Sequence, residues 1–136
     1  MKNQQLAKDY ILRAEKRIVA LKALMEVESW ADVVRESQEC VELALKALLR
    51  VSNMDVPRIH DVSEVLEQQK HRLPHEALQN LDRFIEISRQ LRRDRELAYY
   101  GSEDLTPSEF YKKKDADKAF ADTVFVVEKV KPLINK

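Results

Sequence analysis

The segment WADVVRESQECVELALKALLRV, residues 30–51, is the most apolar stretch of the chain and decides its fold. Its apolar side chains recur three or four positions apart, which is the spacing of one face of an α-helix. They are Trp30, Val33, Val34, Cys40, Val41, Ala44, Ala47, Leu48 and Val51. Because this face is wide, the segment is predicted to be the central helix of a bundle.

Helical spacing also precedes this segment. A first helix is predicted from about residue 4 to 27, where apolar side chains fall three or four positions apart with charges between them. Ser29 is a typical N-cap residue for the second helix, and Asp32 follows three positions later as a short version of the capping box. The first substantial loop is predicted over residues 52–60, which are rich in turn-forming side chains.

A short third helix and a long fourth helix are predicted after that loop. Asp61 or Ser63 could cap the third helix, and Pro74 ends it and opens the fourth. The periodicity of the apolar residues predicts the fourth helix from about residue 75 to 99.

A long connection is predicted between the fourth helix and the last one. Gly101 stands where a helix C-cap is expected, and residues 101–114 form a loop with Pro107 inside it. A loop of that length, in a chain whose other connections are shorter, is a candidate for function. Asp115 could cap the last helix.

The composition supports a fold made of helices alone. Gly occurs once and Pro four times among 136 residues, whereas strand-rich folds need many turns. This length suits one core, and neither a repeat nor a linker divides the chain. The prediction is a single all-α domain over residues 1–136, an antiparallel bundle of four to five helices.

Charge and cysteine content narrow the classes of protein. Lys+Arg and Asp+Glu both number 24, so nucleic-acid binding would need a local basic patch. Cys40 is the lone cysteine and lies on the apolar face of the second helix, so it is predicted to be structural. Neither a membrane span of roughly 20 apolar residues nor a signal-peptide core is evident, and a cytoplasmic protein without membrane contact is expected.

Most catalytic templates have no counterpart in the chain. One glycine cannot form a glycine-rich phosphate loop, and one cysteine cannot supply an all-cysteine zinc site. His71 and His75 are four positions apart, but Pro74 interrupts the helix between them, and His60 adds no ligand pattern. No metal site, no cofactor and no catalytic residue is therefore predicted.

The segment RQLRRDRELAYYG, residues 89–101, is the most informative for function. On an ideal helix Arg95 lies within roughly 40° of the apolar stripe, and Tyr99 follows one turn later. A guanidinium on that side needs an anionic partner. Residue chemistry alone favours an internal carboxylate such as Glu42, or a dimer seam, and expects the other arginines to be solvated. The alternative is a ligand, with phosphate bound by Arg and a base stacked on Tyr.

A polar stripe interrupts the apolar second helix. Gln38, Glu42 and Lys46 are spaced by four, and the order Glu42 to Lys46 favours an i,i+4 ion pair. The stripe is either a solvated helix edge or a polar seam that faces the arginines across the bundle.

Three blocks of sequence resemble the HEPN family of helical bundles. QECVELALKALL, residues 38–49, resembles a helix typically written Gln, two residues, then Val-Glu-Lys-Ala-Leu-Lys-Ala-Leu. IHDV, residues 59–62, is similar to the family's His-Asp-Leu step after the first loop. RELAYYG, residues 95–101, lies where HEPN proteins carry a late arginine-rich motif, so the resemblance covers nearly the whole chain.

The resemblance implies a bundle that usually forms a homodimer. Many HEPN proteins are RNases, often toxins, whose motif is an arginine, four to six residues and a histidine, and the two motifs of a dimer form one composite site. Here Tyr100 and Tyr99 stand at the corresponding distances from Arg95 and Arg93, and no histidine follows His75. Tyrosine, with a reference pKa of about 10, is a poor general base at neutral pH.

The leading hypothesis is a dimeric HEPN-type module, without strong catalysis of its own, that binds a nucleotide, a nucleic-acid end or a minimal nucleotidyltransferase. Arg93 and Arg95 would hold phosphate, and Tyr99 and Tyr100 would stack or hydrogen-bond. The polar stripe of the second helix would support them, with Glu42 orienting an arginine. The alternatives are a divergent, toxin-like, metal-independent RNase that uses Arg95 and Tyr100, and a purely structural interaction protein with arginines in its dimer seam.

Overall fold

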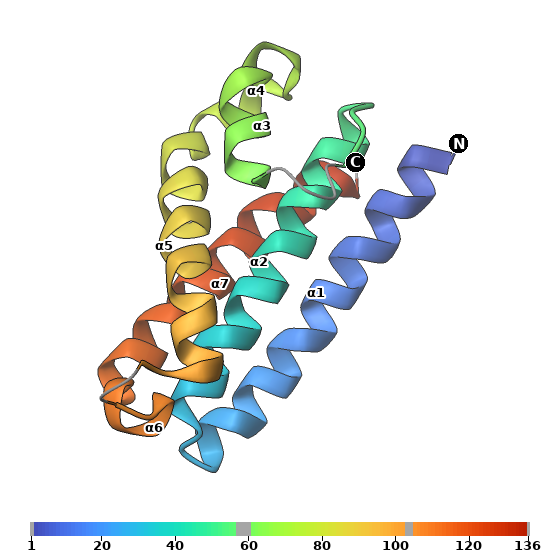
Figure 1. The fold of residues 1–136 in the computed structure, drawn as a ribbon. Coiled ribbons are helices and arrows are strands. Elements are labelled where there is room, and N and C mark those ends of the chain that lie inside the picture. Colours follow the sequence, from blue (N-terminus) through green and yellow to red (C-terminus); the bar gives the residue numbers. More distant parts are fainter. Residues whose placement is uncertain (1, 57–60, 103–104, 136) are drawn as a thin grey trace.

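Apolar periodicity along the chain produces four long helices that lie side by side (Figure 1). The computed structural model describes residues 2–56, 61–102 and 105–135. The long helices are α1 (Lys2–Glu26), α2 (Trp30–Val51), α5 (Leu81–Tyr100) and α7 (Lys113–Ile134). None of the described residues forms a strand, so the predicted all-α bundle is confirmed.

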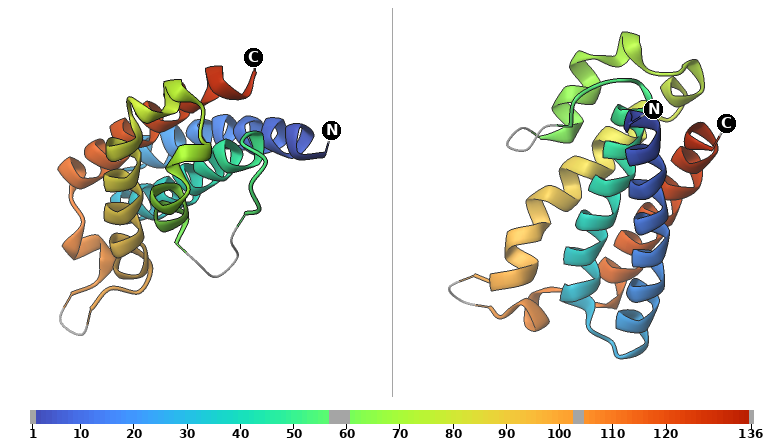
Figure 2. Two further views of the ribbon diagram at one scale, coloured as in Figure 1. Left: turned by 90° about the horizontal axis from the view of Figure 1, so that it is seen from above. Right: turned by 90° about the vertical axis from the view of Figure 1, so that its right-hand side faces the viewer.

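Short helical segments join the long helices at the two ends of the bundle (Figure 2). Those between α2 and α5 are α3 (Val62–Gln68), the 3-10 turn η1 (Lys70–Arg72) and α4 (His75–Leu78). At the opposite end α6 (Pro107–Phe110) lies between α5 and α7. No described helix is long and apolar enough to cross a membrane.

The apolar face of α2 forms the centre of the core, as its width predicts. α2 packs against α1, α5 and α7. Leu45 and Leu48 of α2 and Phe84 of α5 are fully buried. Burying one such side chain contributes about 1.5–3 kcal/mol relative to leaving it in water, so these contacts hold the bundle together.

Cys40 belongs to this core. Its side chain is fully buried, and its Sγ lies 3.2 Å from the carbonyl oxygen of Ala14 on α1. Burial raises the pKa of the thiol to about 12. Because the thiolate is the reactive form, this setting gives Cys40 the properties of a small apolar side chain.

The predicted fourth helix, residues 75–99, is wrong in its first turns. The structure divides this segment into α4 and α5, with a break at Gln79 and Asn80. Asn80 has φ −114° and ψ 5°, and its N–H donates to the carbonyl of Ala77 at 3.2 Å, three residues back. Asparagine side chains compete with helical backbone bonds, which makes such a break inexpensive.

The predicted connection of residues 101–114 is also too long. Thr106 and Glu109 form a capping box that opens α6: the hydroxyl accepts the Glu109 N–H, and the carboxylate accepts the Thr106 N–H, both at 3.2 Å. α7 then begins two residues before Asp115. Asp115 does act as a capping residue, but from the third helical position, where it accepts the N–H of Lys112 at 2.9 Å.

Of the N-caps predicted for α2 and α3, only that of α3 accepts a backbone N–H. Ser29 is the N-cap residue of α2, but its hydroxyl donates to the Asp32 carboxylate at 2.6 Å and accepts no backbone N–H, so the predicted capping box is wrong. Asp61 caps α3 by accepting the N–H of Ser63 at 2.9 Å. Residues 57–60 of the predicted first loop, including His60, lie outside the described residues.

Candidate functional site

Polar faces of α2 and α5 meet in the packed bundle. On α5, Arg92, Arg95 and Tyr99 follow one another at intervals of three and four residues and therefore share a face. On α2, Arg35 and Gln38 share a face for the same reason. Because α2 packs against α5, the two faces border one cleft.

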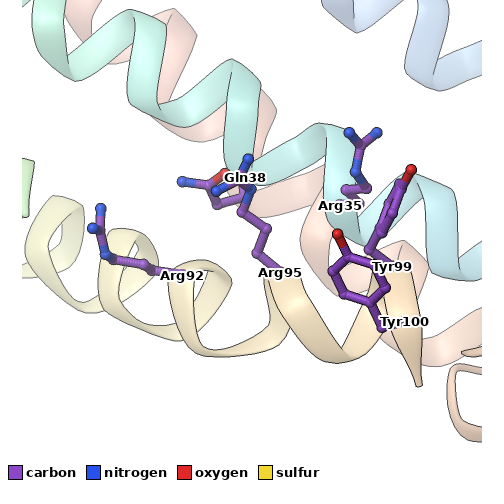
Figure 3. Close-up of a pocket in the computed structure, with 6 residues that line it drawn as sticks. All are labelled: Arg35, Gln38, Arg92, Arg95, Tyr99 and Tyr100. Carbon is purple, nitrogen blue, oxygen red and sulfur yellow. The ribbon is translucent and has the colours of Figure 1, made fainter. Parts of the chain in front are cut away.

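An open pocket of about 460 Å³ lies in this cleft (Figure 3). The residues that line it, called the seam pocket below, are Arg35, Gln38, Arg92, Arg95, Tyr99 and Tyr100. Figure 3 shows Arg92 at one end, Arg95 and Gln38 in the middle, and Arg35 with the two tyrosines at the other end. Three guanidinium groups in one open pocket make it a candidate anion site, because Arg binds carboxylate and phosphate through paired N–H donors.

Arg95 lies at the surface, contrary to the prediction that it extends the buried stripe of its helix. Its side chain is 53% exposed, and its Nη2 lies 3.0 Å from Oε1 of Glu39, one turn before the predicted partner Glu42. The buried face of α5 continues from Leu91 to Ala98, and Arg95 lies at its edge, where α2 presents polar residues. An exposed pair of this kind contributes about 0–1 kcal/mol, so another anion can replace the Glu39 carboxylate at small cost.

Glu42 and its neighbours connect α2 to Arg92. The Glu42 carboxylate accepts from Nε2 of Gln38 at 3.0 Å, pairs with Lys46 at 3.4 Å and lies 4.0 Å from Arg92. The arginine beside Glu42 is therefore Arg92, and Lys46 does not line the pocket. Gln38 is buried, and its Oε1 has no hydrogen-bond partner among the described residues. A donor group of a ligand, or a water molecule, would satisfy this acceptor.

Arg35, which was not among the residues predicted from the sequence, completes the cluster. Its Nη1 pairs with Oε1 of Glu36 at 2.8 Å, and its Cζ lies 4.5 Å from the centre of the Tyr99 ring. The sequence carried a signal for it, since the three- and four-residue spacing of the polar stripe extends back from Gln38 to Arg35.

The two tyrosines form the aromatic end of the pocket. Tyr99 is 53% exposed and Tyr100 is 73% exposed. Their ring centres are 4.5 Å apart and their planes cross at 79°, an edge-to-face arrangement that leaves ring surface open to a ligand.

Arg93 does not join the seam pocket. Its guanidinium donates to the side chain of Gln90 at 2.7 Å and borders a separate groove beside α3. The reason is helical geometry: two residues correspond to about 200° of rotation, which places Arg93 and Arg95 on opposite sides of α5. Arg89 also lies outside the pocket, paired with Glu67 at 3.0 Å.

Two features hold the end of α5 in place. Buried Tyr111, which follows α6, donates a hydrogen bond to the Asp94 carboxylate at 3.0 Å, and burial and the Asp94 charge raise the pKa of Tyr111. Gly101 ends the helix at φ 79°, where an added Cβ would lie 2.6 Å from the carbonyl oxygen of Leu105. The turn that follows the tyrosines thus requires glycine.

The described residues contain no group of three or more His, Cys, Asp or Glu side chains arranged to hold a metal ion. His71 and His75 are exposed, in η1 and at the start of α4, far along the chain from the pocket-lining residues of α2. The arginine, glutamine and tyrosine side chains that line the seam pocket are suited to anion binding, hydrogen bonding and stacking.

The fold and the site together define a helical-bundle protein with an arginine-lined pocket between two of its long helices. The family model described as HEPN domain matches residues 7–133, and the chain belongs to the HEPN family, as its three sequence blocks indicated. It is 32% identical over 140 residues to "Putative toxin MJ1304" from Methanocaldococcus jannaschii, covering 98% of this chain and 91% of that protein. Its fold is similar to the crystal structure of ST0689, an archaeal HEPN homologue, with a TM-score of 0.67, 23% identity, and coverage of 94% of this chain and 97% of that one.

Proposed function

We propose that this chain is a dimeric HEPN module that binds the phosphate of a nucleotide or of an RNA end in the seam pocket without cleaving the ligand. The observation that carries the proposal is that Arg92 and Arg95, which share one face of α5, line the same open pocket. A phosphate offers three acceptor oxygens to Arg92 and Arg95, whereas Glu39 contacts one arginine through one oxygen at 3.0 Å.

Binding without cleavage follows from the side chains at the pocket. Histidine is the side chain whose reference pKa lies nearest neutrality, and none occurs after His75. Arginine stays protonated at all physiological pH values and cannot act as a general base. The name of the similar M. jannaschii protein makes a toxin role the competing proposal, in which Arg95 and Tyr100 would act in RNA cleavage.

A dimer is proposed around the end of α5. The exposed apolar side chains Leu105 and Phe110 follow α5 without lining the seam pocket, and exposed apolar side chains are typical of protein contacts. Light scattering at high micromolar concentration should report twice the monomer mass of 15.9 kDa. A mass equal to one chain would contradict this part of the proposal. The surface would then be the proposed contact for a nucleotidyltransferase partner.

The binding experiment uses AMP and a short RNA with a 5′-phosphate, titrated against the wild type and the double variant Arg92→Ala/Arg95→Ala. The wild type should bind both ligands more weakly as salt rises, because phosphate contacts release counterions. The double variant should lose binding, while Arg93→Ala, on the same helix but outside the pocket, should retain it. Absence of wild-type binding to both ligands contradicts the proposal, and metal-independent cleavage of the RNA that depends on Arg95 would establish the RNase alternative.

A further inference from the structure

The seam pocket has two chemically different ends. Arg92 at one end and Arg95 in the middle supply guanidinium groups, and Arg35 with Tyr99 and Tyr100 supplies a cation and two rings at the other end (Figure 3). Arg95 and Tyr99 are four residues apart, which corresponds to about 6 Å along the helix axis. That spacing matches the scale of one nucleotide from its phosphate to its base.

We propose that the pocket takes a nucleoside phosphate in one orientation, with the phosphate on Arg92 and Arg95 and the base against Arg35, Tyr99 and Tyr100. Arg35 is then a specificity-determining residue that selects ligands carrying a planar ring. This inference rests on the proposed binding of phosphate and adds the second group that the ligand must carry.

Two neighbours orient the guanidinium group of Arg35 in the absence of a ligand. Its guanidinium lies 4.5 Å from the centre of the Tyr99 ring, and its Nη1 is 2.8 Å from Oε1 of Glu36. The other oxygen of Glu36 is held by Arg17 of α1 at 3.0 Å. Arg35 is a planar cation that contacts the Tyr99 ring and is paired with Glu36. It therefore loses little conformational freedom when a base stacks on it, which favours binding.

Tyr100 supplies the open ring surface at this end. It is 73% exposed, and it meets Tyr99 edge to face with the ring centres 4.5 Å apart. Two rings at 79° form a corner, in which a base can stack on one ring while its edge meets the other. Stacking of this kind tolerates every base, so the selection is for a ring and not for one sequence.

The experiment compares AMP with ribose 5-phosphate, which carries the same phosphate and no base, by NMR titration of the full chain. AMP should bind about 5- to 150-fold more tightly, the gain that base stacking gives. Arg35→Lys keeps the charge but removes the planar group, so it should reduce this ratio while the affinity for ribose 5-phosphate stays within about twofold. Tyr100→Ala should also reduce the ratio, and Tyr100→Phe should preserve it.

Arg93→Lys is the matched control for Arg35→Lys, since it makes the same change outside the pocket, and thermal melting checks that each variant is folded. Equal affinities for AMP and ribose 5-phosphate, both lost in Arg92→Ala/Arg95→Ala, would overturn the inference and leave phosphate binding standing. No binding of either ligand would remove the proposed function itself. A trinucleotide with a 5′-phosphate that binds more tightly than AMP identifies the ligand as an RNA end, and the reverse order identifies a free nucleotide.

Discussion

The two faces of α2 differ in burial and in charge. On the core face, Cys40, Leu45 and Leu48 are fully buried against neighbouring helices. On the seam face, the side chains of Arg35 and Glu39 keep 31% and 30% of their surface exposed and are paired with charges. Buried apolar area stabilises the fold, whereas partly exposed ion pairs add little stability and leave their groups available for exchange.

We expect the core face of α2 to determine stability and the seam face to determine ligand affinity. A change on the core face should lower the free energy of unfolding with little direct effect on the ligand. A change on the seam face should alter affinity with little effect on unfolding. The following variants test this division.

Leu48→Ala on the core face should have the largest effect. Removing a fully buried leucine side chain leaves a cavity, and the free energy of unfolding should fall by about 2–5 kcal/mol. Urea unfolding followed by circular dichroism measures it. Leu12→Ala on α1, where the leucine is 48% exposed, is the control and should change stability by no more than about 0.5 kcal/mol. Similar losses for the two variants would break the comparison.

Arg95→Ala across the seam should affect mainly the ligand. Loss of a charge-assisted hydrogen bond to phosphate should reduce affinity for AMP by about 1–3 kcal/mol. Because the Arg95–Glu39 pair is half exposed, the free energy of unfolding should fall by less than about 1 kcal/mol. Calorimetric titration and thermal melting measure the two quantities. A loss of several kcal/mol in stability would instead make Arg95 a structural residue.

Alkaline pH should weaken the core face through Cys40. Burial raises the pKa of this thiol from 9.0 to about 12, so its contribution to stability is fully present below about pH 9 and is lost as pH rises toward 12. The free energy of unfolding should fall by up to about 1.4 kcal/mol per pH unit in that range. Denaturation of the wild type and of Cys40→Ala at pH 8 to 11 isolates this effect from Tyr111, whose raised pKa acts in both proteins. Parallel pH curves for the two proteins would show that the thiol is not the cause.

Glu39→Gln on the seam face should have the smallest effect and the opposite sign for binding. The variant removes the carboxylate that pairs with Arg95 at 3.0 Å. Phosphate should then bind a fewfold more tightly, because an exposed ion pair contributes about 0–1 kcal/mol. Glu26→Gln, at the exposed end of α1, is the control and should leave affinity unchanged. Weaker binding by Glu39→Gln would mean that the carboxylate supports the site and does not compete with the ligand.

The candidate site could be predicted from the sequence only in part. The structure places Gln38, Arg95, Tyr99 and Tyr100 in one pocket, as the polar stripe and the arginine segment suggested. Arg93 does not line this pocket, because distance along the sequence to a tyrosine says nothing about which side of the helix a residue occupies. Whether the pocket binds phosphate stays a prediction for the titrations above.

The sequence by itself determined the elements of this protein and their inner faces. Apolar residues at intervals of three and four fix which side of each helix avoids water, and a single glycine among 136 residues leaves little room for any other fold. Only the tertiary structure decided which groups meet across the seam: Glu39 beside Arg95, and Arg35 over Tyr99. Such pairings depend on how far α2 is shifted and rotated against α5, and that register follows from the packing of the whole core, which no local pattern specifies.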